Sequence, residues 1–283
     1  MNEVYEERKE ALLHRIREYA AEDVAVAFSG GTDSSLLLKL ACEAAKETGK
    51  RVLAVTMKTR LHPAAELIEA ARAAADMGAE HRTIQVDELA EAGILDNPRD
   101  RCYRCKRLLF AKLCSLAKDM GIRQILEGTN EDDLHVYRPG IRALEELGIT
   151  SPLAEAGFTK TQVRLLAAEY GLASADKPAS PCMATRFPYG TRLSYEEMDR
   201  AALGEAYLRG LGFYNVRLRV HGEIVRLEVD AEAFSEIFAR RQEIIARMKE
   251  LGYRYITLDL EGFRSGSMDI RGITRMVSCG PFR

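Results

Sequence analysis

The sequence predicts an α/β protein, with a parallel sheet covered by helices on both faces, followed by a smaller α+β domain. Apolar strands alternate with amphipathic helices up to residue 127, and this rhythm is typical of βαβ units. The expected strands are 24–28, 51–57, 81–86 and 123–127, and the expected helices are 5–20, 32–48, 64–77 and 106–120. After about residue 190 the order becomes helix, strand, strand, helix, strand, which indicates the second domain.

The domain boundary is expected in the linker 187–192, where proline and glycine interrupt the pattern. The predicted domains are therefore 1–190 and 191–260, with a tail of uncertain order over 261–283. Ser194 and Glu197 have the spacing of a capping box, which predicts a helix that runs to about residue 211. The strands 214–220 and 223–230, a helix over 231–250 and a strand over 253–260 complete the second domain.

Composition excludes several classes of protein. The chain has 283 residues, of which 47% are hydrophobic and 30% charged, and a net charge of −2. A charge so close to zero argues against a nucleic-acid partner, although local arginine clusters could still bind phosphate. No apolar run approaches the length of a membrane span, and the charged N-terminus is no secretory signal, so we expect a cytoplasmic protein without a membrane partner.

The segment Ser29-Gly30-Gly31-Thr32-Asp33-Ser34-Ser35 lies between a predicted strand and a predicted helix. Two glycines let the backbone turn there, so that its N–H groups and those opening the helix converge on an anion. The serine hydroxyls add donors, and Asp33 is a candidate ligand for a metal ion that bridges phosphate oxygens. No lysine follows the second glycine, so this is not the common NTPase loop. A glycine-rich turn without a ligand is the alternative.

Two further segments, 57–60 and 128–133, also follow predicted strands. Ligands of parallel sheets bind beyond the carboxyl ends of the strands, so one cleft is expected to collect all three segments. Asp132 and Asp133 could hold Mg²⁺ there, but acidic residues at that point are equally well explained as helix caps.

The six cysteines of a cytoplasmic chain indicate metal binding or catalysis rather than disulfides. Cys102 and Cys105 form a CxxC motif just before the predicted helix 106–120, among arginines and lysines that favour the thiolate. The motif alone is open to zinc, redox exchange or an iron–sulfur cluster. Cys182 is the expected third ligand, whereas Cys42 and Cys114 lie on apolar helix faces. Three thiolates on a [4Fe–4S] cluster leave one iron without a protein ligand.

Together these motifs resemble the LarE family, ATP-dependent sulfur transferases that help to make the nickel-pincer nucleotide cofactor. The segments that carry the resemblance are 29–35, NPRDRCYRCK at 97–106, GTNEDD at 128–133, RPGIRALEELGITSPL at 138–153, KPASPCMATRFPYGT at 177–191 and YITLDLEGFRSGSM at 255–268. The first of these is shared by other ATP pyrophosphatases. PCxxxRFPYG and RSGSM are much more specific, and the resemblance covers about residues 5–270.

The resemblance implies an adenine nucleotide α-hydrolase-like fold, ATP and Mg²⁺ as cofactors, and a pyridinium dicarboxylic acid mononucleotide as acceptor. ATP adenylates one carboxylate, and sulfur then replaces AMP. The implied ATP-binding residues are Ser29, Gly30, Gly31, Asp33, Ser34, Ser35, Thr56, Gly128, Thr129 and Asn130. Arg217 and Arg219, which alternate with apolar residues along one strand, would grip the acceptor phosphate together with Arg264; a solvated strand face is the alternative. Cys182, Asp33 and Lys106 are the implied catalytic residues.

The family uses two sulfur sources. Members with three cysteines resemble this chain, and the resemblance implies a [4Fe–4S] cluster on Cys102, Cys105 and Cys182 that receives sulfur from a sulfide donor. A sacrificial Cys182 is the alternative source. Two other functions compete, namely a tRNA thiolase and an ATP-binding protein with structural zinc. The resemblance further implies a homo-oligomer.

Overall fold

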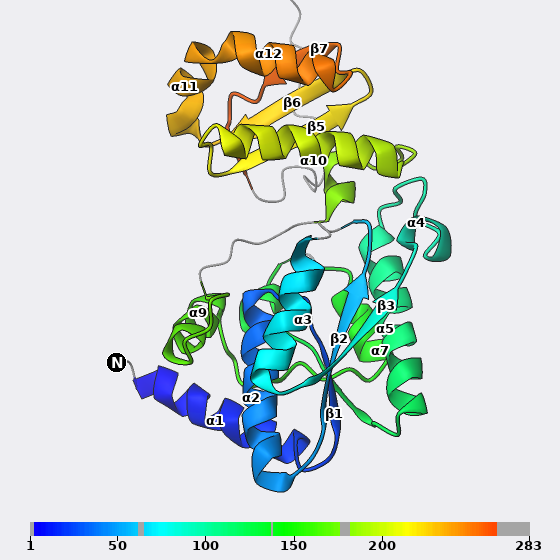
Figure 1. Ribbon diagram of the computed structural model, residues 1–283, viewed down its shortest axis with the longest axis vertical. Coiled ribbons are helices and arrows are strands. Elements are labelled where there is room, and N and C mark those ends of the chain that lie inside the picture. The colour runs from blue at the N-terminus through cyan, green and yellow to red at the C-terminus, as the bar shows by residue number, and fades with distance from the viewer. Residues whose placement is uncertain (1–2, 62–64, 137, 176–181, 265–283) are drawn as a thin grey trace, which may run out of the picture. The chain divides into compact units, whose positions relative to one another are not determined.

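The computed structural model describes residues 3–61, 65–136, 138–175 and 182–264. The chain separates into two compact units, Met1–Pro181 and Cys182–Arg283 (Figure 1). The division falls directly before Cys182, which is nearer the N-terminus than the linker 187–192 predicted from the sequence.

The first unit contains a sheet of four parallel strands in the order β3-β2-β1-β4. The strands are β1 (Val24–Ala27), β2 (Val52–Lys58), β3 (Glu80–Gln85) and β4 (Gln124–Leu126). Val24 of β1 pairs with Val52 on one side and with Gln124 on the other. The predicted parallel sheet is confirmed, and its strand order reverses between β1 and β4, where ligands of such sheets bind.

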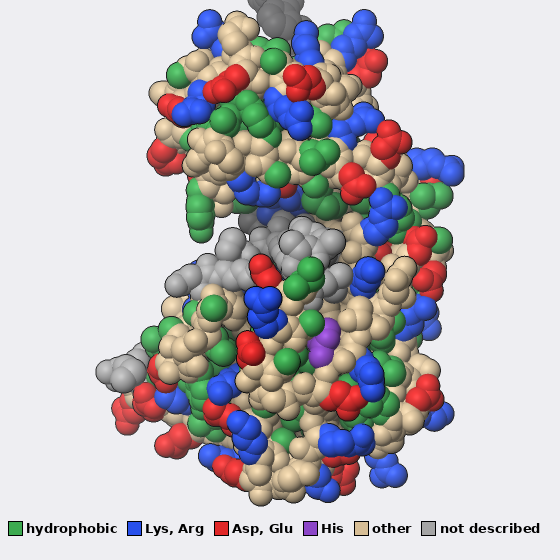
Figure 2. All heavy atoms as spheres, in the orientation of Figure 1, with side chains coloured by type: hydrophobic (Ala, Val, Ile, Leu, Met, Phe, Trp, Pro, Cys, Tyr) green, Lys and Arg blue, Asp and Glu red, His purple; other side chains and the backbone are tan. Residues whose placement is uncertain are grey.

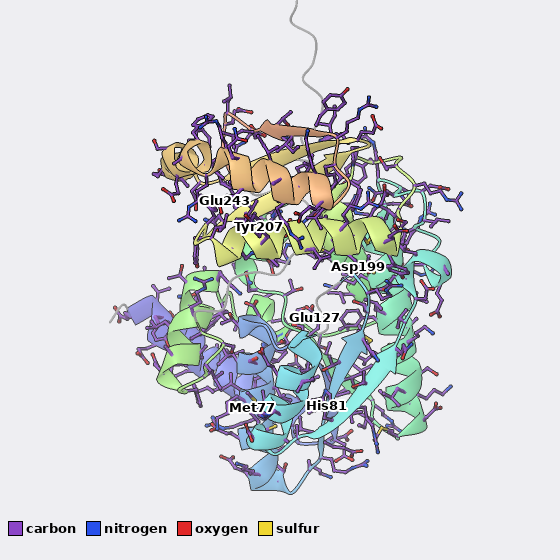
Figure 3. All side chains as sticks on the ribbon, turned by 45° about the horizontal axis from the view of Figure 1, so that its top comes forward. Met77, His81, Glu127, Asp199, Tyr207 and Glu243 are labelled. Atoms are coloured by element: carbon purple, nitrogen blue, oxygen red, sulfur yellow. The ribbon has the colours of Figure 1, made fainter. Side chains whose placement is uncertain are left out.

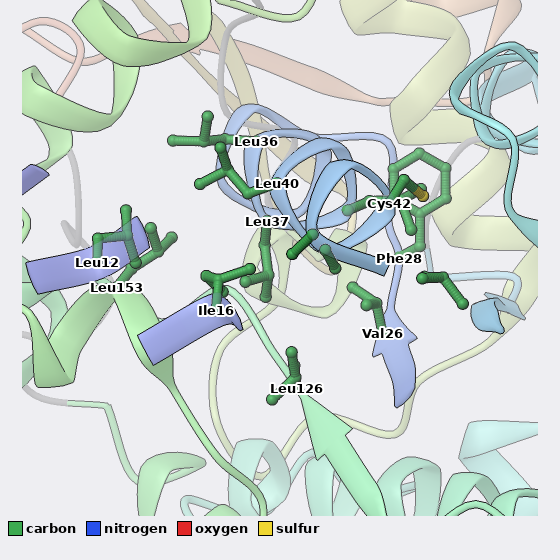
Figure 4. Packing of buried hydrophobic residues seen from close by; sticks show 14 of the residues in the cluster. Leu12, Ile16, Val26, Phe28, Leu36, Leu37, Leu40, Cys42, Leu126 and Leu153 are labelled. Atoms are coloured by element: carbon green, nitrogen blue, oxygen red, sulfur yellow. The ribbon is translucent and has the colours of Figure 1, made fainter. Parts of the chain in front are cut away.

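Helices cover both faces of this sheet, as the sequence predicts. Val24 and Val26 face a cluster built with α1 (Glu3–Tyr19), α2 (Thr32–Thr48), α3 (Ala65–Met77) and α9 (Lys160–Glu169). Figure 4 shows part of this cluster, in which Ile16 of α1 lies beside Leu37 of α2. Ala25 faces the opposite cluster, which is built with α5 (Arg101–Asp119) and α7 (Ile141–Glu146). Alternation along β1 therefore distributes its side chains between the two layers.

Two features of the first unit differ from the prediction. Helix α5 begins at Arg101 rather than near residue 106, so the CxxC motif lies inside the first two turns of the helix and not before it. Helix α9 was not expected, and neither were the four short helices α4 (Glu88–Glu91), α6 (Glu131–Leu134), α7 and α8 (Pro152–Glu155). Segments of four to six residues are too short to show a helical periodicity.

The second unit has a three-stranded mixed sheet in the order β5-β6-β7, with strands β5 (Val216–His221), β6 (Ile224–Val229) and β7 (Tyr255–Leu258). Strands β5 and β6 are antiparallel, and β7 runs parallel to β6. The Ser194 hydroxyl accepts the Glu197 N–H at 3.1 Å and caps α10 (Tyr195–Gly210), which confirms the predicted helix start. The helix expected over 231–250 is divided into η2 (Ala231–Ala233), α11 (Phe234–Ala239) and α12 (Arg241–Glu250).

Charges of both signs are interspersed over the visible face of each unit, as Figure 2 shows. This mixture agrees with the net charge of −2. None of the helices in the described ranges has the length and apolar character needed to cross a bilayer.

Candidate functional site

The loop between β1 and α2 adopts the turn that its two glycines permit. Gly30 has φ of +72°, a conformation that favours glycine, and Ala70 lies 3.4 Å from the place where a Cβ would stand. Gly31 is the N-cap of α2 and supplies no side-chain cap to the first turn. The backbone N–H groups of that turn can therefore bind an anion at the positive end of a 17-residue helix.

Two serine hydroxyls brace this turn. Ser29 Oγ lies 3.0 Å from Ser34 Oγ and accepts the Gly31 N–H at 3.3 Å. Ser34 Oγ also accepts the Ser29 N–H at 3.2 Å, whereas Ser35 is buried on α2. The hydroxyls of Ser29 and Ser34 thus hold the loop in a shape that suits an anion.

A pocket of about 330 Å³ opens beside the loop, at the carboxyl ends of β1, β2 and β4. Its lining residues come from the ends of β1 and β2, from the segments that follow β1, β2 and β4, and from α5, with Arg138 from the segment before α7; they are Ala27, Phe28, Ser29, Asp33, Ser34, Val55, Thr56, Met57, Thr59, Lys106, Leu109, Phe110, Glu127, Gly128, Thr129, Asp133 and Arg138. The volume suits a nucleotide-sized ligand. The pocket brings together the predicted residues Ser29, Asp33, Ser34, Thr56, Lys106, Gly128 and Thr129, whereas its lining does not include Gly30, Gly31, Ser35 or Asn130.

Gly128 lets the segment after β4 approach the first turn of α2. A Cβ at this position would lie 3.1 Å from Asp33 Cβ and 3.1 Å from the Ser34 backbone nitrogen. Both are atoms of the phosphate loop or its helix, and neither belongs to the far end of a flexible side chain. A side chain at position 128 would therefore force the first turn of α2 to shift by a few tenths of an ångström.

We expect Gly128→Ala to push the first turn of α2 away and to raise the KM for ATP about tenfold, because overpacking of this kind costs about 1–3 kcal/mol. Steady-state kinetics of pyrophosphate release measure the change. Gly210→Ala is the matched control, since nothing lies within 4 Å of a Cβ at Gly210. An unchanged KM in Gly128→Ala would show that the loop absorbs the methyl group.

The Thr56 side chain links the strands that precede the phosphate loop. Its hydroxyl donates to the Phe28 carbonyl at 2.8 Å and lies 2.9 Å from His81 Nε2. Since the hydroxyl proton is directed to Phe28, the histidine nitrogen is the donor of the second bond. Burial lowers the pKa of His81, which favours its neutral ring. Thr56 therefore contributes by holding β1 against β2 and β3.

Glu127, directly after β4, is a site residue that the sequence analysis did not identify (Figure 3). It is only 5% exposed, and its Oε1 accepts the Thr129 N–H at 2.8 Å and the Ser151 hydroxyl at 2.5 Å. Its Oε2 lies 3.4 Å from Nζ of Lys106, which reaches the pocket from α5. Its position at the end of a buried strand was the available signal.

The two aspartates after Asn130 act as helix caps. Asp133 Oδ2 accepts the Asn130 N–H at 3.3 Å, and Arg138 lies 2.9 Å from Asp133 Oδ1. Burial raises the pKa of Asp133, although Arg138 opposes this shift. Asp132 accepts the backbone N–H of Lys160 at 2.8 Å. Both carboxylates thus have the capping role that the sequence left as the alternative to Mg²⁺ binding.

Asp33, the expected metal ligand, has a protein partner on each oxygen. Asn130 Nδ2 lies 3.2 Å from its Oδ1, and Lys160 Nζ lies 2.5 Å from its Oδ2. Lys160 was not identified from the sequence, although Thr159 and Gln162 flank it with the spacing of a capping box, which the structure contains. That spacing was the signal for a helix start at this point.

The cysteines of the motif stand on α5, three residues apart, so they share one face of the helix. Cys102 is exposed, and Cys105 is partly exposed. The N-terminal turns of a helix favour thiolates, the ligands that iron–sulfur clusters require, so these donors fit the expected group. Among the described residues no three His, Cys, Asp or Glu side chains are arranged to hold a metal ion.

Cys182 is the N-cap of η1 (Met183–Arg186) in the second unit, and its backbone is tightly held. Its carbonyl accepts the Thr185 hydroxyl at 2.8 Å and lies 3.4 Å from Arg186 Nη1. Arg186, which the sequence analysis did not identify, forms a buried bidentate pair with Glu205, at 2.8 and 2.9 Å. Its place in the PCxxxRFPYG segment was the available signal.

The two arginines of β5 have different surroundings. Arg219 is 1% exposed, because η1 covers this part of the strand; its Nε bonds to Glu228 at 3.0 Å and its Nη1 to the Thr185 carbonyl at 2.6 Å. The solvated strand face considered above is therefore wrong for Arg219. Arg217 lies partly exposed over the Phe263 ring, at 5.0 Å, and the described residues include no carboxylate within ion-pair distance of it. Burial, Arg186 and Arg219 lower the pKa of Arg217 to about 10.

Arg264, the third predicted phosphate ligand, has acidic neighbours. Its Nη2 lies 2.6 Å from Glu261 and 3.6 Å from Asp259, and the latter also approaches Arg226 at 3.4 Å. Of the three arginines, Arg217 is thus the cation whose charge is least compensated within the described residues.

Comparisons with known proteins agree with this geometry. A model of the PP-loop domain matches residues 2–136. The pyridinium-3,5-bisthiocarboxylic acid mononucleotide synthase of Lactiplantibacillus plantarum is 38% identical over 87% of this chain and 88% of its own length. An uncharacterised protein of Synechocystis, slr1717, is 36% identical over 92% of this chain and 97% of its own.

More distant relatives share a part of the chain. A tRNA-specific 2-thiouridylase of Synechococcus is 31% identical over 60% of this chain and 52% of its own length. The family is assigned from the similarity to the synthase, which extends over most of both chains, and not from the partial similarity to the thiouridylase. The chain belongs to the LarE family, and its ATP-binding unit is a PP-loop domain.

Proposed function

We propose that this protein is an ATP-dependent sulfur transferase that converts a carboxylate of pyridinium-3,5-biscarboxylic acid mononucleotide into a thiocarboxylate. The observation that carries the proposal is a preformed PP-loop pocket in a chain that resembles the named synthase over most of both lengths. The nickel-pincer nucleotide cofactor is the corresponding end product.

The first step activates the acceptor. A carboxylate oxygen attacks the α-phosphorus of ATP, the bond from the α-phosphorus to the bridging oxygen breaks, and pyrophosphate leaves with Mg²⁺. The loop N–H groups bind the leaving phosphates, and Lys106 stabilises charge at the α-phosphate from the other side of the pocket. Asp33 is the proposed Mg²⁺ ligand.

In the second step sulfide attacks the acyl carbon of the adenylate. The tetrahedral intermediate expels AMP, which carries away the oxygen of the former carboxylate, and the thiocarboxylate remains. No oxidant or reductant is required. Sulfur therefore enters at the oxidation level of sulfide, and the donor must supply sulfide.

Cys102, Cys105 and Cys182 are the proposed ligands of a [4Fe–4S] cluster. When bound, a cluster held by three thiolates supplies one iron without a protein ligand, as a place for exogenous sulfide. Iron and sulfide analysis with the absorption spectrum of anaerobically purified protein tests this assignment. A colourless protein with stoichiometric zinc would contradict it and would favour the structural-zinc alternative.

The activity itself is tested with the whole chain, Mg²⁺-ATP, the mononucleotide and sulfide. We expect AMP, pyrophosphate and thiocarboxylate in equal amounts. Sulfur transfer to tRNA, with none to the mononucleotide, would overturn the proposal in favour of the tRNA thiolase alternative. We further propose a cytoplasmic homo-oligomer that acts without nucleic acid, and retained activity after RNase treatment tests the last point.

Arg217 is the proposed ligand of the acceptor phosphate, since its partly buried charge has no carboxylate partner among the described residues. Arg217→Gln is expected to raise the KM for the mononucleotide about ten- to one-hundredfold, because hydrogen bonds to charged groups contribute about 1.5–3 kcal/mol. The KM for ATP should not change.

Arg254→Gln is the matched control, since Arg254 also lies over a ring, that of Tyr255, at 5.6 Å. An acceptor without its phosphate should bind the wild type and Arg217→Gln equally. A persistent difference with that acceptor would show that Arg217 acts elsewhere.

A further inference from the structure

Asp33 bears a protein cation at the position where the proposed reaction needs a metal ion. Nζ of Lys160 lies 2.5 Å from Asp33 Oδ2, and the two side chains are 37% and 25% exposed. The contact joins residues 127 positions apart in the chain. The pair is thus a tertiary contact at the edge of the phosphate loop.

The backbone of Lys160 is fixed although its side chain is long. Its N–H donates to Asp132 at 2.8 Å, and the adjacent Thr159 caps α9 together with Gln162. Arg8 of α1 donates to the Gln162 side chain at 3.1 Å. The Cα of Lys160 therefore stays in place, while four methylene groups let the ammonium change partner.

We propose that Lys160 exchanges Asp33 for the pyrophosphate part of ATP when Mg²⁺ binds. Asp33 would hold Mg²⁺ with its carboxylate, and the released Lys160 ammonium turns to the β- and γ-phosphate oxygens held by the neighbouring loop. Each charged group keeps a partner of opposite charge in this exchange, since the carboxylate gains a metal ion and the ammonium gains a phosphate. Lys160 then stabilises the pyrophosphate as its bond to the α-phosphorus breaks.

Lys106 is not an alternative for this role. Its ammonium lies 3.4 Å from Glu127, on the α5 side of the pocket. Lys106 and Lys160 thus each pair with a different carboxylate. Only the partner of Lys160, Asp33, belongs to the phosphate loop. The inference rests on the proposed cleavage of ATP to AMP and pyrophosphate.

Binding of inorganic pyrophosphate with Mg²⁺, measured by titration calorimetry, tests the exchange without any acceptor. Lys160→Met is expected to weaken this binding about ten- to one-hundredfold, and Lys160→Arg is expected to restore part of it. Lys39→Met is the control, because Lys39 pairs with Glu43 at 2.9 Å further along the same helix α2. Equal affinity of wild type and a folded Lys160→Met would overturn the proposal.

A second variant tests the exchange itself. In Asp33→Asn the Lys160 ammonium has no carboxylate partner to give up. Pyrophosphate without Mg²⁺ should therefore bind this variant several-fold more tightly than the wild type. Adding Lys160→Met should abolish this gain, which a merely structural lysine would not do. No gain in Asp33→Asn would contradict the exchange. If the binding results hold but no adenylate forms with the mononucleotide, the proposed function fails and the role of Lys160 stands.

Discussion

Cys182→Ala is expected to reduce thiocarboxylate formation to the background rate while ATP is still cleaved. In the proposed function the Cys182 thiol delivers sulfur, whereas the phosphate loop and its pocket belong to the first unit. Folding of the turn should survive, because the contacts of residue 182 with Thr185 and Arg186 use its carbonyl oxygen. Parallel assays of pyrophosphate and thiocarboxylate in the presence of sulfide measure the uncoupling.

Cys114→Ala is the control for general loss of a thiol. Cys114 is partly exposed on α5, and burial raises the pKa of its thiol, so that it stays protonated. Equal loss of ATP cleavage and sulfur transfer in Cys182→Ala would contradict the separation of the two steps. The mass of wild-type protein after turnover identifies the sulfur source. We expect Cys182 to keep its sulfur, and its loss would select the sacrificial route.

Arg186→Met is expected to destabilise the protein by about 3–5 kcal/mol, because removing one member of a buried ion pair leaves the other charge uncompensated. Glu205 is 2% exposed and would keep its bonds to the Leu218 N–H, at 3.1 Å, and to Arg209, at 3.0 Å. Thermal and denaturant unfolding measure the loss. Arg240→Met, which removes an exposed pair with Glu236, should cost less than about 1 kcal/mol.

The cost of Arg186→Met should depend on pH. Burial alone would raise the pKa of Glu205, but the bonds from Arg186, Leu218 and Arg209 lower it in the folded protein. A lowered pKa stabilises the fold above the ordinary carboxyl pKa, and this stabilisation is lost as the pH falls through the lowered value. Without Arg186, the effect of burial on the Glu205 pKa is the larger one, so protonation of Glu205 removes the buried charge that destabilises the variant. The stability gap should therefore narrow in acid, and a constant gap would contradict this account.

Local pattern was sufficient to predict the sheet and the phosphate loop. Strands β1, β2 and β4 follow from apolar runs and β3 from an alternating segment, and the turn at Gly30 follows from a glycine between a strand and a helix. The start of α5 was predicted too late, because a segment rich in proline, arginine and aspartate resembles a loop. In the structure the helix begins immediately after that segment, at Arg101.

Contacts between distant segments could not be predicted in the same way. The alternation along β5 places Arg217 and Arg219 on one face, but it does not reveal that η1 covers Arg219. Lys160 meets Asp33 only because α9 packs beside α2, and no local spacing encodes that approach. Glu127 was visible as the residue that ends a buried strand, yet its bonds to Ser151 and Lys106 depend on the folded chain.

The pocket carries its own counter-ions. Asp33 pairs with Lys160, Glu127 with Lys106, and Asp133 with Arg138, so three acidic and three basic side chains compensate one another around the phosphate site. Free ATP entering such a site meets carboxylates as well as cations, whereas the magnesium complex brings a cation for the carboxylate whose lysine partner is released. If Lys160 exchanges Asp33 for phosphate as proposed, the pocket should therefore bind metal-complexed ATP more tightly than free ATP.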